Sequence, residues 1–185
     1  MVAQLPANLT IRRGGQADAV AIAGLHADSW RRHYRGAYTD AYLDADIGAE
    51  RLGVWTERLA SQDGSTCTLL AEADGAFVGF LHVVFDEDPR WGSLVDNLHV
   101  EWTRKRGGVG SRLLAAAAGA VVAQGGGLHL WVLQQNTAAQ AFYSARGGRC
   151  VESRPVPPPG GRENRLNGSP VGLRFAWPDP AVLLA

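Results

Sequence analysis

The sequence contains little of what several protein classes require. Only two cysteines occur among the 185 residues, Cys67 and Cys150, and they form no metal-binding or redox spacing. We therefore expect reduced thiols and no disulfide framework. The five histidines show no ligand spacing with each other or with the cysteines, so we expect no metal site. A reducing, cytoplasmic setting is the simplest expectation for such a chain.

An excess of charge of one sign is also missing. Lys plus Arg and Asp plus Glu both number 18, so the formal net charge is zero. Without a basic excess the chain produces no long-range field that attracts nucleic acid or an anionic membrane, and we expect neither as a partner. The basic cluster at residues 104–106 is then a local feature of a site.

Long apolar runs are absent too. The longest, Leu113–Ala123, is rich in alanine and too short to cross a bilayer. The segment Met1–Pro6 lacks the basic region and the apolar run of a signal peptide, so we expect none. With 46% hydrophobic residues and six tryptophans, we expect one globular domain over residues 1–185.

Hydrophobic periodicity and turn signals predict a series of strands and helices. The predicted helices cover residues 17–34, 49–59, 108–124 and 136–146. The predicted strands cover residues 9–12, 66–73, 76–85, 93–100, 128–133, 149–156 and 171–177, and Asp74-Gly75 marks a hairpin. A hairpin, two β-α units and final antiparallel strands predict an α/β fold: one mixed, mostly antiparallel sheet with helices on both faces.

The most informative segment runs from Leu98 to Leu114. A strand ends, a basic turn follows, and Gly107, Gly108 and Gly110 precede a helix. Glycines leave the backbone open to a ligand, and the first N–H groups of a helix attract anions, so the segment predicts a phosphate or pyrophosphate site. It is neither a P-loop nor a complete dinucleotide fingerprint, because Leu113 takes the place of the third glycine.

The string from Lys105 to Gly110 resembles the Gln/Arg-x-x-Gly-x-Gly/Ala signature of the GNAT acetyltransferase superfamily. Lys105 replaces the usual Gln or Arg, and Trp102 stands where many members have proline. The resemblance implies a GNAT-like fold and acetyl-CoA as the acyl donor. It implies that the cofactor is bound by the strand end and the loop, namely Leu98, His99, Val100, Lys105, Arg106, Gly107, Gly108, Val109, Gly110 and Ser111. In the family a backbone N–H near Val100 also binds the oxyanion.

The segment from Asn136 to Gly147 carries a second resemblance. Ala138, Ala141, Phe142 and Ala145 recur at helical spacing and predict the buried stripe, so packing of that face does not explain the neighbouring Tyr143. The pattern resembles the second GNAT motif, in which a tyrosine holds the place of the general acid. The resemblance implies that this role belongs to Tyr143 and that Asn136, Ala139, Phe142 and Tyr143 contact the cofactor.

A base is needed because an alkyl amine with a pKa of about 10.4 is mostly protonated at pH 7. Strand alternation predicts that Asp96 shares a face with Leu94, Leu98 and Val100 and interrupts that apolar row. Many GNAT members carry an acidic residue near this point, and Asp96 is our candidate base. The other candidates are His82, His99 and Glu101.

The acceptor is the least specified part of the reaction. In the resembling family the acceptor site is shaped by the segments that correspond to Ser29–Tyr38 and Pro155–Pro170. The second segment is equally well interpreted as a floppy surface connection. The acidic turn Asp86–Asp88 either faces a cationic amine or is simply solvated. We expect a small-molecule amine acceptor and a monomer or homodimer. A protein N-terminal or lysine acetyltransferase, a non-catalytic acyl-CoA sensor and an unrelated nucleotide-binding protein remain open.

Overall fold

A computed structural model describes residues 8–185 apart from 46 and 62. The N-terminal segment expected to contain no signal peptide lies outside the described residues. Seven strands form one sheet in the order β1-β2-β3-β4-β5-β7-β6. The strands are β1 (Leu9–Arg13), β2 (Thr66–Ala73), β3 (Ala76–Asp88), β4 (Gly92–Val100), β5 (Leu128–Leu133), β6 (Arg149–Pro155) and β7 (Val171–Trp177). The β4–β5 pair is parallel and the other pairs are antiparallel, which confirms the predicted mixed, mostly antiparallel sheet.

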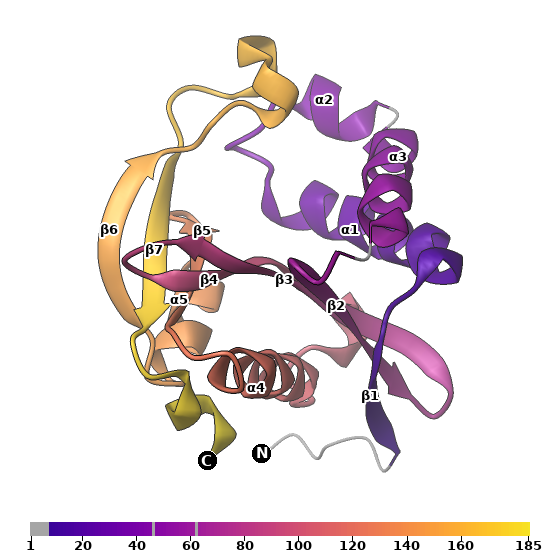
Figure 1. Ribbon diagram of the computed structural model, residues 1–185. Coiled ribbons are helices and arrows are strands. Elements are labelled where there is room, and N and C mark those ends of the chain that lie inside the picture. Colours follow the sequence, from indigo (N-terminus) through magenta and orange to yellow (C-terminus); the bar gives the residue numbers. More distant parts are fainter. Residues whose placement is uncertain (1–7, 46, 62) are drawn as a thin grey trace.

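Helices cover both faces of the sheet, as predicted (Figure 1). They are α1 (Ala19–His33), α2 (Asp40–Asp44), α3 (Ile47–Ala60), α4 (Val109–Val122) and α5 (Thr137–Ser144). On one face α4 and α5 close the largest core, which includes Leu113, Leu130 and Tyr143. On the other face α1 and α3 pack through Ile22 and Trp55. Within the described residues no helix combines the length and the apolar character needed to cross a membrane.

The β2–β3 hairpin follows its sequence signal. Asp74 and Gly75 both have positive φ, 53° and 78°, and Ala73 pairs with Ala76 across them. Two central residues with φ > 0 match the right-handed twist of the flanking strands. The hairpin therefore forms where the sequence predicts it.

A β-bulge in β4 corrects one prediction. His82 pairs with Asn97 and Val83 with Val95, so Asp96 has no opposite residue on β3. Val95 consequently belongs to the same core as Leu98 and Val100, and simple alternation along β4 fails. We expected Asp96 to share an apolar row with Leu98 and Val100, and this prediction is wrong. Asp96 turns toward α3 instead, where Arg58 donates to it.

The parallel pairing of β4 and β5 is short. It joins Ser93 to Leu128, Leu94 to His129 and Val95 to Leu130, and it then ends. Both strands continue beyond this point, β4 to Val100 and β5 to Leu133. The two strands therefore separate toward their carboxyl ends, leaving backbone edges that face a gap.

The segment Pro155–Pro170 is a largely exposed surface connection that also makes specific contacts with the domain. It contains two short 3₁₀ turns, Pro159–Gly161 and Glu163–Arg165. The Thr39 amide donates to the Arg165 carbonyl over 2.9 Å, and the Arg165 guanidinium pairs with Glu50 on α3 at 2.8 Å. The segment thus closes over α2 and α3.

Candidate functional site

A groove of about 1050 Å³ opens where β4 and β5 separate. Its wall combines the carboxyl ends of both strands, the glycine-rich loop, the start of α4, α5 and the end of α1. Of the cofactor contacts and the first-choice catalytic residues proposed from sequence, all but Gly107 line it: Asp96, Leu98, His99, Val100, Lys105, Arg106, Gly108, Val109, Gly110, Ser111, Asn136, Ala139, Phe142 and Tyr143. Two motifs that are distant in sequence therefore form one site.

The wall also contains residues outside the two motif-derived sets. Ser29, His33 and Tyr34, at the end of α1 and just after it, belong to the segment Ser29–Tyr38 that the resemblance places at the acceptor site, whereas Trp131 of β5 and Arg146 after α5 were not predicted. No local motif marks Trp131, since it reaches the groove only through the sheet topology. Arg146 lies within the segment we singled out, and its charge at a helix end was a usable signal.

The glycine-rich loop has the conformation that an anion site needs. Gly108 is left-handed, with φ 77°, and caps α4; Arg106 also has a positive φ, 65°. The first amide bonded within the helix is that of Arg112, which donates to the Gly108 carbonyl at 3.1 Å. The amides of Val109, Gly110 and Ser111 precede it and lie at the positive end of the helix dipole.

Cationic side chains surround this helix start. Arg146 donates from Nε to Ser111 Oγ at 3.0 Å, and its guanidinium lies 4.0 Å from the centre of the Phe142 ring. In the loop before α4, Lys105 Nζ is 2.5 Å from His33 Nε2 and 4.7 Å from the centre of the exposed Trp102 ring. Positive charge therefore comes to this part of the groove from both motifs.

The second motif forms the predicted capped helix, but with a different buried face. Asn136 Oδ1 accepts from the Ala139 amide at 3.2 Å, which confirms the cap. Ala138, Ala141 and Ala145 are exposed, so the predicted buried stripe is wrong.

Tyr143, which we placed beside that stripe, is the buried residue of α5. It is 8% exposed and packs against Phe175 and Trp177. The same side chain lines the groove, so packing fixes the position of the phenol at the site. Desolvation raises the pKa of Tyr143 to about 12, so the hydroxyl keeps its proton at neutral pH.

Asp96 faces the groove from the bulge. Its Oδ2 accepts from Arg58 at 2.6 Å and from Asn97 Nδ2 at 2.7 Å. Within the described part of the chain, no side-chain or backbone donor bonds its Oδ1. One carboxylate oxygen is therefore held by the protein while the other can accept a proton or a hydrogen bond from a ligand.

The alternative bases are less suited to that role. His82 and Glu101 are not among the groove residues. His99 Nδ1 is 2.7 Å from Ser29 Oγ, and His82 Nδ1 is 2.8 Å from Thr68 Oγ1, so both rings are satisfied by hydroxyls. Burial lowers the pKa of His82 to about 4 and that of His99 to about 3. Both rings are neutral and weakly basic at pH 7.

One backbone donor faces the gap between the strands. The Glu101 amide donates to the Val78 carbonyl at 2.8 Å, on the β3 side. Because successive amides of a strand point in opposite directions, the Val100 amide points away from β3 and toward the groove. A carbonyl oxygen bound there would meet a fixed donor.

Most of the aromatic segment Ser29–Tyr38 serves packing. Trp30 stacks on Tyr34 with ring centres 5.1 Å apart and meets Tyr38 edge-on at 5.3 Å. Arg51 lies 4.6 Å over the Trp30 ring. Of these aromatic residues only Tyr34 lines the groove, and burial raises its pKa. The segment thus joins α1 to α2 and α3 and presents one phenol to the site.

Comparisons with known proteins agree with this arrangement. The model of the acetyltransferase (GNAT) family matches residues 27–147, which include both motifs and the residues of β4 and β5. No curated protein matches the sequence.

Solved structures share the fold. The PaiA N-acetyltransferase from Thermoplasma acidophilum, solved in complex with coenzyme A, is 18% identical with a TM-score of 0.71, over 92% of this chain and 99% of that one. YncA from Salmonella typhimurium, solved with its cofactor acetyl-CoA, is 20% identical with a TM-score of 0.64, over 93% and 94%. A GCN5-related N-acetyltransferase from Rhodopseudomonas palustris is 20% identical with a TM-score of 0.70, over 95% and 97%. On the evidence of both motifs, the sheet that joins them and the family match, the chain belongs to the GNAT acetyltransferase family.

Proposed function

We propose that this protein transfers an acetyl group from acetyl-CoA to the primary amine of a small molecule, by direct attack in a ternary complex. One observation carries the proposal: an anion-binding helix start and a buried, protonated tyrosine line the same groove. The presence of coenzyme A and acetyl-CoA in the structures of PaiA and YncA supports the choice of donor. The open α4 amides would bind the pyrophosphate, with Lys105 and Arg146 supplying positive charge.

The acyl transfer uses three groups of this site. The amine nitrogen attacks the thioester carbonyl, and the Val100 amide stabilises the oxyanion that forms. When the tetrahedral intermediate collapses, the C–S bond breaks and the Tyr143 hydroxyl donates its proton to the leaving thiolate. Asp96 accepts the proton that the amine loses, directly or through water. The products are an amide and coenzyme A, and proton exchange with solvent restores both side chains.

Charge favours a cationic acceptor. Asp96 and Tyr34 both line the groove, and Arg58 holds only Oδ2 of the Asp96 carboxylate. The cationic side chains that line the groove lie instead at the glycine-rich loop and after α5. An ammonium group is therefore attracted to the end of the groove where the reaction takes place, while the phosphates bind at the other end. A small alkyl amine fits this division of charge.

The first test separates binding from turnover. Calorimetric titration with acetyl-CoA, coenzyme A and NAD is followed by a thiol-release assay across a panel of amines that includes peptides with free N-termini and lysines. Micromolar binding confined to the coenzyme A compounds, with turnover of small amines, is the expected result.

Each other result selects a different function. Turnover of peptides alone would indicate a protein acetyltransferase. Binding without turnover of any amine would indicate an acyl-CoA sensor. Binding of NAD in preference to coenzyme A would refute the loop assignment.

A further inference from the structure

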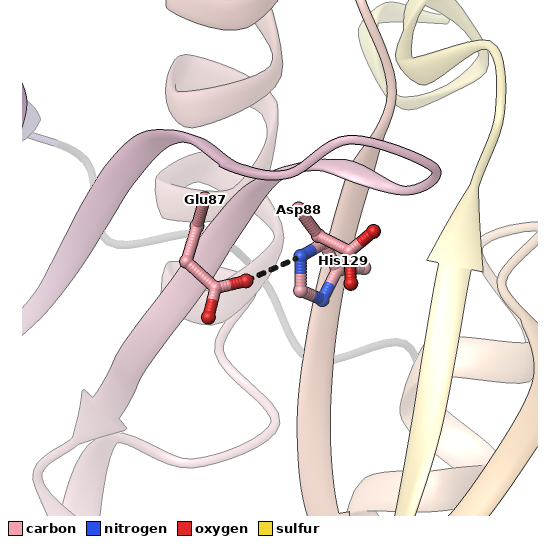
Figure 2. A group of neighbouring side chains, drawn as sticks. All are labelled: Glu87, Asp88 and His129. Atoms are coloured by element: carbon pink, nitrogen blue, oxygen red, sulfur yellow. Dashed lines mark ion pairs between the residues drawn. The ribbon is translucent and has the colours of Figure 1, made fainter.

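A second polar cluster lies at the opposite end of the β4–β5 pair. Glu87 and Asp88 end β3, and His129 lies near the start of β5, where it pairs with Leu94 of β4. Figure 2 shows the Glu87 side chain pointing toward the imidazole, with Asp88 beside the ring. None of these three residues lines the groove of the proposed reaction.

His129 is buried without satisfying its polar atoms. Its side chain is 0% exposed, and neither ring nitrogen has a hydrogen-bond partner among the described residues. A buried polar atom without a partner is costly and uncommon in folded proteins. The ring is aimed into the acidic cluster, since Nε2 lies 3.3 Å from Glu87 Oε2 without hydrogen-bond geometry.

The spacing of the donor atoms fits a shared ion. Two ligands bound to one tetrahedral Zn²⁺ at about 2.0–2.1 Å stand about 3.3 Å apart. That is the separation of His129 Nε2 and Glu87 Oε2, 3.3 Å. One ligand atom from each of Glu87, Asp88 and His129 lies within 4.8 Å of the others, so a small movement of the exposed Glu87 side chain would bring the three around one ion.

The surroundings hold more negative than positive charge. Arg174 binds Asp88 Oδ2 at 2.6 Å and lies 3.1 Å from Glu152, so one guanidinium is shared by two carboxylates. Among the described residues, Glu87 forms no ion pair with an arginine or a lysine. The other Asp88 oxygen accepts from the amides of Arg90 and Trp91 at 2.8 and 3.0 Å, which fixes its carboxylate. A divalent cation would offset the remaining negative charge.

We propose that Glu87, Asp88 and His129 bind a Zn²⁺ ion, with water as the fourth ligand. One imidazole and two carboxylates form a donor set that zinc accepts. The ion would join the end of β3 to β5 and stabilise the paired end of the two strands that separate at the groove. The histidine and cysteine spacing in the sequence gave no sign of this site, because its carboxylates come from a different strand.

The experiment titrates chelator-treated full-length protein with Zn²⁺ by calorimetry and with Co²⁺ by visible absorption. Glu87→Gln is the test variant, since its side chain is 43% exposed and the change leaves the core intact. Asp86→Asn is the matched control: it removes the same charge one residue earlier, outside the three-residue set. The change also suits the positive φ of 49° at that position.

We expect one Zn²⁺ per chain, an intense four-coordinate Co²⁺ spectrum and a higher melting temperature with zinc. Glu87→Gln should weaken zinc binding by at least about tenfold, and Asp86→Asn should leave it unchanged. Equal loss in both variants, or no stoichiometric binding by the unaltered protein, would overturn the proposal. An octahedral Co²⁺ spectrum that is the same in Glu87→Gln would also overturn it, because it would indicate general surface binding.

Discussion

Arg146, just after α5, donates a hydrogen bond of 3.0 Å to Ser111 Oγ in the first turn of α4. The contact joins the two sequence motifs at the point where an anion would bind. The guanidinium adds charge to the open amides of the helix, and it lies in the same groove.

Replacing Arg146 with methionine removes this charge and keeps most of the side-chain volume. We expect the dissociation constant for acetyl-CoA to rise about tenfold to a hundredfold, as for the loss of a hydrogen bond to a charged group. Calorimetry at two salt concentrations checks this, because the variant should also show a weaker salt dependence. Arg154→Met, on β6 outside the groove, is the control; equal affinity in both variants would contradict the assignment.

Gly108→Val should abolish measurable acetyl-CoA binding. The residue has φ 77°, which a β-branched side chain strongly disfavours, and any side chain there would cover the helix amides. Isothermal titration measures the affinity and circular dichroism checks the fold. Gly24→Val is the control, since an added Cβ there meets nothing within 4 Å. Unchanged affinity in Gly108→Val would show that the phosphates bind elsewhere.

Tyr143→Phe removes the proposed acid while preserving the ring that packs in the core. Turnover should fall by about 10²–10⁴ with little change in the affinity for acetyl-CoA. Steady-state kinetics with a small amine measures both quantities. Tyr38→Phe removes a hydroxyl outside the groove and should retain activity. Because the pKa of Tyr143 is raised to about 12, the unaltered enzyme should show no loss of turnover from this group up to about pH 10. Full activity in Tyr143→Phe would remove it from the mechanism.

Asp96→Asn tests the base. Asparagine has the shape of the aspartate side chain, and its amide oxygen can still accept from Arg58 and Asn97. The amide cannot, however, accept a proton at neutral pH. We expect turnover to fall by about 10²-fold and the pH–rate profile to change form, with the amine's own ionisation now setting the rate. Glu57→Gln, an exposed acid on α3, is the control. An unaltered profile in Asp96→Asn would assign this carboxylate to structure alone.

Two histidines, the buried His82 and the half-buried His99, predict acid sensitivity. The pKa of His82 is lowered to about 4 and that of His99 to about 3, so both rings are neutral in the folded protein. Stability is not affected by these rings above about pH 6.5, and it falls progressively as the pH drops from about 6.5 toward the folded-state pKa values, because over this range the unfolded chain binds the protons and the folded chain does not. At pH 5 each ring should lower the free energy of unfolding by roughly 2 kcal/mol. Urea titrations at pH 7.5 and pH 5 measure the loss, which should be smaller in His82→Gln.

Much of the fold is local in origin and therefore predictable. The strands at 66–73, 128–133 and 171–177 have the predicted bounds, because apolar runs, glycines and turn residues delimit them. The short helix Asp40–Asp44 was not predicted. It depends on contacts of Tyr42 and Leu43 in a distant core, and a five-residue segment carries no periodicity.

The parts of the site that a local backbone signal marks were predicted from the sequence. The parts that only the sheet topology brings together were not. The glycine spacing and the asparagine cap are local signals, and both motifs line the groove. The bulge at Asp96 was not predictable, since it arises from pairing with β3 and has no residue signature of its own. The buried stripe predicted for α5 was wrong for a related reason. Alanine is compatible with either the buried or the exposed side of a helix, so its spacing does not identify the buried side.

The separation of β4 and β5 has a consequence for how such proteins diverge. A recess formed by main-chain edges and a helix start depends on strand geometry more than on the identity of the side chains. Substitutions can then accumulate around it without removing it, as long as a few glycines and the strand pairing persist. This accounts for relatives that share the whole architecture at 18–20% identity. Selection for a new acceptor could therefore act on α1, α2 and the segment after β6 while the donor site stayed intact.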